Sequence, residues 1–89
     1  MIEFDFIEWD DDDDPTGNVR HIAEHDITPE EVEDVLYGSG SDGVSRTTGR
    51  PIRFGRTSTG REVVVIYEAE QDGGVTVIRP ITAYEHGEG

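Results

Sequence analysis

The sequence predicts a single small domain over residues 1–89 of the α+β class, with two helices packed on an antiparallel sheet of about four strands. Three observations lead to this class. A strand-like run opens the chain, two segments with helical periodicity follow, and three further strand-like runs separated by turn residues fill the second half. The predicted order of elements is therefore β-α-α-β-β-β.

The first strand is predicted over residues 2–9, whose sequence is IEFDFIEW. Apolar and acidic side chains alternate at the start of this run, which is the period of a half-buried strand, and Trp9 closes it. The strand has to join the sheet, because Phe4 and Phe6 would otherwise stay exposed to water.

The first helix is predicted over about residues 16–25, after a run of aspartates at 10–14. The pair Asp14–Pro15 is typical of a helix start, since the carboxylate caps free amides and proline tolerates the first turn. We therefore expect this short helix to begin directly after Pro15.

The second helix has the strongest local signal in the chain, in the sequence ITPEEVEDVLYG (27–38). Thr28 is the expected N-cap, Pro29 takes the first helical position, and Glu31 completes a capping box. Gly38 suits the position that ends the helix.

The region from 38 to 51 is rich in glycine, serine and threonine and offers almost nothing to bury, so we expect a long flexible loop there. Three strands are then expected at 52–56, 61–69 and 75–81, joined by turns into an antiparallel meander. Pro80 places the end of the last strand at an edge or a bulge.

The composition restricts the environment and the partners. The chain has 21 acidic residues, seven basic residues, no cysteine and a formal net charge of −14. All of the basic residues are arginine, a combination that resembles proteins adapted to high internal salt. At molar salt the Debye length falls to about 3 Å, so net charge alone does not exclude RNA as a partner. Without cysteine, a signal-peptide pattern or a long apolar run, the sequence predicts a cytoplasmic protein with no membrane partner.

The stretch HIAEH (21–25) fits the H-x-x-E-H pattern of one class of zinc peptidase. His21 and His25 would lie on one helix face, where they can grip one zinc ion, and Glu24 would act as general base. The metal also needs a third ligand and an enclosed cavity, and the sequence shows no obvious source of either. The alternative is a pair of exposed histidines, and we expect no metal and no cofactor.

Six of the seven arginines lie in residues 38–89. Arg53, Arg56, Arg61 and Arg79 fall on or beside the three predicted strands, so a meander would bring several of them to one sheet face. Such a cluster suits phosphate, because the planar guanidinium binds oxygens through two parallel hydrogen bonds. The alternative is that these arginines pair with nearby glutamates, namely Glu62, Glu68 or Glu70.

Four segments, taken in order, resemble the BrnT family of toxins from type II toxin–antitoxin systems. In that family a FEWD-type opening leads to a K-H-G-[V/I]-[ST]-x-E-E segment, then to a hairpin of the type G-x-x-x-x-G-R-x-x-x-V-V-Y, and finally to a closing strand. The matching segments are FIEWD (6–10), HDITPEEVEDVL (25–36), GRTSTGREVVVIYE (55–68) and VTVIRPITAYE (75–85).

The resemblance implies a RelE-like α+β fold, metal-independent ribonuclease activity, an RNA substrate and neutralisation by an antitoxin of the ribbon-helix-helix kind. In such an enzyme the ribose 2′-hydroxyl attacks the adjacent phosphate. On this interpretation His25 is the general acid/base, Arg53 and Arg79 stabilise charge on the phosphoryl oxygens, and Arg56 and Arg61 hold the RNA.

The sequence also departs from the family pattern. Glu24 and Asp26 replace the lysine and glycine that flank the family's histidine, and the basic C-terminal helix is missing. A chain without those charges can keep the fold and lose the activity. The second hypothesis is therefore a non-catalytic protein-interaction module, either a homodimer or a domain that binds another protein.

Overall fold

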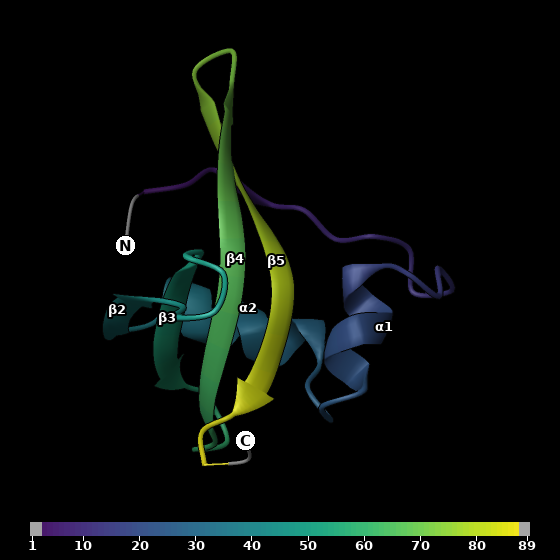
Figure 1. The fold of residues 1–89 in the computed structure, drawn as a ribbon, viewed down its shortest axis with the longest axis vertical. Coiled ribbons are helices and arrows are strands. Elements are labelled where there is room, and N and C mark those ends of the chain that lie inside the picture. The colour runs from purple at the N-terminus through teal and green to yellow at the C-terminus, as the bar shows by residue number, and fades with distance from the viewer. Residues whose placement is uncertain (1–2, 88–89) are drawn as a thin grey trace.

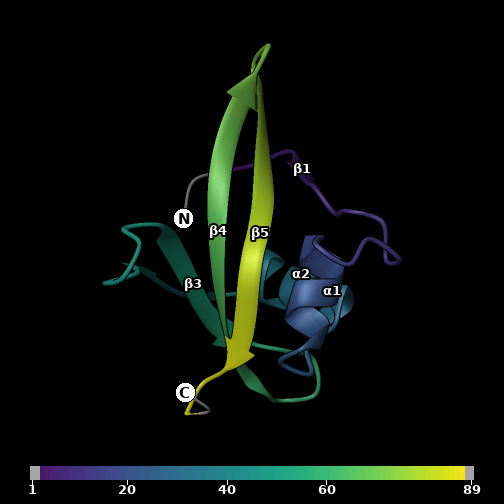
Figure 2. The same ribbon diagram turned by 45° about the vertical axis from the view of Figure 1, so that its right-hand side comes forward.

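The computed structural model describes residues 3–87, which form a two-layer α+β domain with both helices on one side of the sheet (Figures 1 and 2). The elements along the chain are β1 (Phe6–Ile7), α1 (Asn18–Ala23), α2 (Pro29–Tyr37), β2 (Gly40–Val44), β3 (Pro51–Arg56), β4 (Glu62–Asp72) and β5 (Val75–Glu85). Neither helix has the length and apolarity that crossing a membrane would need.

The sheet has five strands in the order β1-β5-β4-β3-β2. The α+β class is confirmed, and β3 to β5 form the expected antiparallel meander. Strand β2 extends this meander by a strand that was not predicted, and the sheet is mixed because β1 pairs in parallel with β5. Parallel pairing requires a long connection, which the helices and the meander supply here.

The first strand is much shorter than predicted. It joins the sheet as expected, but it covers only Phe6–Ile7 of the predicted 2–9 range, and residue 2 lies outside the described residues. Phe4 packs against the core as expected, whereas Phe6 stays 60% exposed, so its predicted burial is wrong. The carboxylate of Asp5 accepts a hydrogen bond from the backbone N–H of Thr76 at 2.9 Å. The backbone N–H of Asp5 also donates to the carbonyl of Thr76 at 2.8 Å, so Asp5 is tied to β5 through both its backbone and its side chain.

The region from 38 to 51 is not the continuous loop that its composition suggested. Strand β2 occupies its first half and pairs with β3 from Gly40 opposite Gly55 to Val44 opposite Pro51. All of its side chains are exposed, so this edge strand is held by backbone hydrogen bonds and needs no apolar pattern. Hydrophobic periodicity cannot detect such a strand.

The hairpin of β4 and β5 is longer than expected and extends well beyond the helices (Figure 1). Its turn consists of Gly73 and Gly74, whose positive φ angles of 59° and 87° fit a two-residue hairpin turn. Pro80 does not end β5. A register shift opposite it, between Ile66 and Tyr67, forms the irregularity that accommodates a residue without a backbone N–H.

The two helices differ in how well the sequence predicts their starts. Helix α2 begins with the predicted capping box, in which Thr28 accepts from the N–H of Glu31 and the Glu31 carboxylate accepts from the N–H of Thr28. Helix α1 is shorter than the predicted 16–25, and its N-cap is Gly17. The Asp14 carboxylate instead accepts hydrogen bonds from Thr16, which forms a turn before the helix.

One hydrophobic core joins the helices to a single face of the sheet. Helix α1 packs on β5, and α2 packs on β3 and β4. The core consists of Ile22, Ile27, Val32, Val35, Leu36, Val63, Val65, Tyr67, Ile78 and Ala83, with Phe4, Ile7 and Trp9 packed against it. The N-terminal segment therefore completes the core at the edge of β5.

Candidate functional site

The structure links Arg61 to the residue that follows His25, and the family resemblance selected both Arg61 and His25. His25 directly follows α1, and its ring centroid lies 6.5 Å from that of Tyr84 in β5 and 6.1 Å from that of His21. Arg61 precedes β4, and its Nη1 donates to the backbone carbonyl of Asp26 at 3.0 Å. A guanidinium is thus bound to the residue next to His25.

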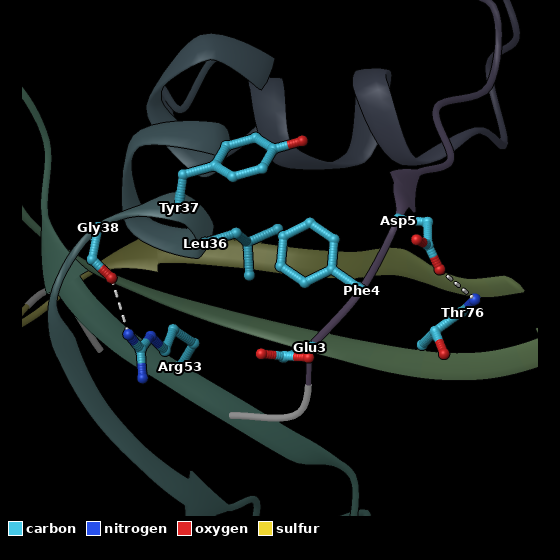
Figure 3. A pocket seen from close by; sticks show the side chains of 8 residues that line it. All are labelled: Glu3, Phe4, Asp5, Leu36, Tyr37, Gly38, Arg53 and Thr76. Atoms are coloured by element: carbon cyan, nitrogen blue, oxygen red, sulfur yellow. Dashed lines mark hydrogen bonds between the residues drawn. The ribbon is translucent and has the colours of Figure 1, made fainter.

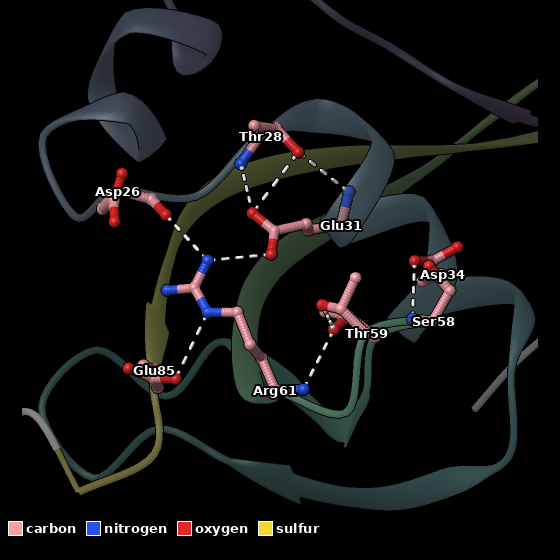
Figure 4. Close-up of polar contacts among 9 residues, drawn as sticks. Asp26, Thr28, Glu31, Asp34, Ser58, Thr59, Arg61 and Glu85 are labelled. Atoms are coloured by element: carbon pink, nitrogen blue, oxygen red, sulfur yellow. Dashed lines mark hydrogen bonds and ion pairs between the residues drawn. The ribbon is translucent and has the colours of Figure 1, made fainter.

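That guanidinium is already held by carboxylates (Figure 4). Arg61 Nη1 donates to Glu31 Oε2 at 2.8 Å, and its Nε donates to Glu85 Oε2 at 3.2 Å. The hydrogen bonds to Glu85 and Glu31 raise the pKa of Arg61. Since Glu31 also belongs to the capping box with Thr28, Arg61 ties the start of α2 to the end of β5.

The two arginines of β3 point to opposite faces of the sheet. Arg53 lies on the same face as Gly55, where α2 packs, and alternation along the strand puts Arg56 on the other face. Arg53 donates to Asp42 at 3.1 Å and to the carbonyl of Gly38 at 2.8 Å. Its side chain is only 12% exposed, and its buried Nε has no hydrogen-bond partner within residues 3–87.

Arg56 and Arg79 are also paired. Arg56 is 71% exposed and donates to Glu62 at 3.2 Å. Arg79 donates to both oxygens of Asp10 and to Glu8, and these bonds raise its pKa. The four arginines therefore do not all share one sheet face: the register places Arg56 and Arg79 on the face opposite to Arg53, and acidic neighbours pair with each of them.

Asn18 organises the attachment of the N-terminal segment, and the sequence analysis missed it. The residue is 4% exposed, and its side-chain amide donates to the carbonyls of Glu8 and Pro80. Asn18 and Asp10 also exchange two hydrogen bonds of 2.9 Å, each from a backbone N–H to the other's side chain. A signal was present, because Asn18 lies four residues before Ile22 on the buried side of the helix.

A largely open concave site lies between the end of α2, strand β3 and the N-terminal segment (Figure 3). Its volume is about 670 Å³, and it is lined by Glu3, Phe4, Asp5, Leu36, Tyr37, Gly38, Arg53 and Thr76. The rings of Phe4 and Tyr37 have centroids 5.3 Å apart and are tilted by 42°. Only Arg53 among these residues was predicted as a site residue.

The chemistry of this pocket is mixed. Tyr37 is 67% exposed and offers an aromatic surface, while Glu3 and Asp5 are exposed carboxylates. Arg53 contributes a guanidinium whose charge is matched by Asp42. The pocket therefore combines an aromatic wall, an acidic rim and a hydrogen-bond donor.

Within residues 3–87, no group of three or more histidine or acidic side chains is arranged to hold a metal ion. No protein-family model, curated protein or solved structure matches the chain.

Proposed function

We propose that this chain is a non-catalytic protein-interaction module, built on a BrnT-like fold, whose partner is another protein. The observation that carries the proposal is the pairing of the arginines. Each of the four arginines selected for RNA binding or catalysis donates to at least one carboxylate. Arg61 and Arg79 each donate to the carboxylates of two residues.

This pairing matters because RNA is held through its phosphates. A phosphate approaching Arg61 has to displace Glu31 or Glu85 and then remain beside the displaced negative charge. The same holds at Arg79 with Glu8 and Asp10. The arginines therefore support the fold more readily than they support an RNA substrate.

The overall charge favours a different partner. A chain with a net charge of −14 repels polyanions at ordinary salt and attracts positively charged protein surfaces. An antitoxin of the ribbon-helix-helix kind, which the family resemblance implies, belongs to the class of proteins that would be tested first.

A specific observation also favours ribonuclease activity as the second candidate. The bond from Arg61 to the carbonyl of Asp26 puts a guanidinium next to His25, so an acid/base group and a cation lie in one region. On this proposal His25 exchanges a proton with the 2′-hydroxyl or the leaving oxygen, and Arg61 stabilises charge on the phosphoryl group after leaving Glu85.

An RNA cleavage assay separates the two proposals. The protein is incubated with labelled single-stranded RNA and a metal chelator at about 0.1 M and about 2 M salt, because molar salt screens the acidic surface. His25→Ala is compared with wild type, and His21→Ala, in α1 four residues earlier, serves as the matched control. We expect RNA to remain intact with all three proteins.

Cleavage by wild type and by His21→Ala, but not by His25→Ala, would contradict the interaction module and establish the ribonuclease. Cleavage that is equal in all three proteins would indicate a contaminating nuclease, which a fresh preparation has to remove before the comparison is made.

A further inference from the structure

We propose that the pocket beside Tyr37 receives a positively charged side chain from an extended segment of the partner, with arginine as its preferred residue. This inference rests on the proposed function, since it names the site and the chemistry by which the interaction module holds its partner. The pocket lies between the end of α2 and the N-terminal segment (Figure 3).

The aromatic wall is suited to a cation. The rings of Phe4 and Tyr37 both line the pocket and lie 5.3 Å apart at an angle of 42°, so they form one aromatic wall. A guanidinium or ammonium group is attracted to the face of an aromatic ring within about 6 Å. Tyr37 is 67% exposed, so its ring is accessible without any rearrangement of the core.

The acidic rim adds the charge that a cation needs. Glu3 and Asp5 are both exposed and both line the pocket. Asp5 is held in place because its Oδ2 accepts from the backbone N–H of Thr76 at 2.9 Å, and Glu3 lies two residues before it. An anionic ligand would meet these two carboxylates, whereas a basic side chain is stabilised by them.

Arg53 does not exclude a cation from this pocket. Its charge is matched by Asp42 at 3.1 Å, and its Nη2 donates to the carbonyl of Gly38. Its Nε is buried, so within residues 3–87 the guanidinium faces the fold with this atom and does not present it to a ligand.

Size and charge favour a peptide segment over the other occupants. A volume of about 670 Å³ holds one long side chain with its flanking backbone, within the range of about 300–1,000 Å³ that is usual for ligand sites. A second copy of this chain brings a further charge of −14, which opposes self-association through this acidic rim.

The test is a titration of the full chain with the blocked pentapeptide Gly-Ser-Arg-Ser-Gly, followed by amide chemical shifts in NMR. The same peptide with citrulline in place of arginine is a neutral control of nearly equal shape. We expect saturable shifts centred on Tyr37, Gly38, Arg53 and Thr76 with the arginine peptide, and no saturation with the citrulline peptide.

Two pairs of variants locate the site. Glu3→Gln is compared with Glu30→Gln, which removes the same charge from α2 outside the pocket. Tyr37→Ala is compared with Val44→Ala, because both side chains are about two-thirds exposed. We expect Glu3→Gln and Tyr37→Ala each to weaken binding about two- to fivefold, as for an exposed ion pair and an exposed cation–π contact. The two control variants should bind as wild type does.

If Glu3→Gln and Glu30→Gln weakened peptide binding equally, or if the chemical shifts changed evenly over the acidic surface, the pocket would not be the binding site. The proposal of an interaction module would not be affected by that result. Saturable binding of the citrulline peptide with the same affinity would overturn the role of the charge. RNA cleavage that needs His25 would instead overturn the proposed function, and the peptide titration does not depend on that result.

Discussion

Arg79 and Asp10 form a two-pronged ion pair, in which Nη1 donates to Oδ1 at 3.1 Å and Nη2 donates to Oδ2 at 2.8 Å. The pair joins β5 to the segment that follows β1, and it uses the planar geometry for which a guanidinium is suited. The same geometry would have served a phosphate. In this chain the carboxylate of Asp10 binds where a phosphate could bind, and Arg79 holds β5 to the N-terminal segment.

The first prediction concerns stability in acid. Hydrogen bonds from Arg79 and from the backbone of Asn18 hold the pKa of Asp10 below its ordinary value of 3.8. Because the folded pKa is the lower one, the stabilisation is complete well above pH 3.8 and is lost as the pH falls through the folded value. We expect Asp10→Asn to be less stable than wild type at pH 7, with a difference that shrinks below pH 3.8.

Urea unfolding measured from pH 7 down to about pH 2.5 checks this prediction. Asp12→Asn, an exposed change in the same aspartate run, is the matched control and should follow the wild-type curve. A difference between Asp10→Asn and wild type that stays constant with pH would contradict the account.

The second prediction concerns Asn18. Replacing it by alanine removes the amide that donates to the carbonyls of Glu8 and Pro80 in a buried position. We expect a loss of about 2–3 kcal/mol in the free energy of unfolding, because buried acceptors are left without donors. Chemical denaturation measures this loss. A loss below about 0.5 kcal/mol, as for an ordinary surface substitution, would show that the hydrogen bonds of Asn18 are not required for stability.

The third prediction tests the start of α2. Thr28→Ala removes the side-chain oxygen that accepts from the N–H of Glu31. We expect a loss of about 1 kcal/mol, the usual effect of deleting a helix N-cap. Thr47→Ala, in the exposed turn between β2 and β3, should leave the stability unchanged. If both substitutions lowered the free energy of unfolding equally, the side chain of Thr28 would not stabilise the start of α2.

The fourth prediction tests strand β2, which the sequence did not indicate. A Cβ at Gly40 would collide with the backbone oxygen of Phe54, so Gly40→Ala has to disturb the pairing with β3. At Gly43 a Cβ would meet only side-chain atoms of Ile52, at 3.3 Å or more. Hydrogen exchange should therefore accelerate in β2 for Gly40→Ala and change little for Gly43→Ala. Identical exchange in both variants would mean that β2 is not paired as described.

The parts of the fold that the sequence predicted are those with a local signal. The capping box at Thr28 and the apolar runs of β4 and β5 depend on neighbouring residues, and the structure confirms them. The predicted start of α1 was wrong because the Asp14 carboxylate accepts a hydrogen bond from Thr16 and does not cap the helix. Strand β2 and the parallel pairing of β1 depend on distant backbone partners, which local patterns do not encode.

The candidate site was predicted less well, for a related reason. The sequence shows which arginines exist, but their roles depend on which carboxylates the fold brings beside them. Arg61 meets Glu31 and Glu85 from distant parts of the chain, and neither pairing can be read from spacing. The pocket was missed because its wall combines Phe4 with Tyr37, which lie on separate elements and meet only after folding.

We propose that the four candidate arginines are held by carboxylates of the fold and are therefore not available to RNA. The most direct measurement is an NMR titration of the Arg61 Nε–H resonance with single-stranded RNA, since this group donates to Glu85. We expect the resonance to stay in place at every RNA concentration while the RNA remains intact. A saturable shift of the Arg61 resonance, accompanied by cleavage that His25→Ala abolishes, would contradict it.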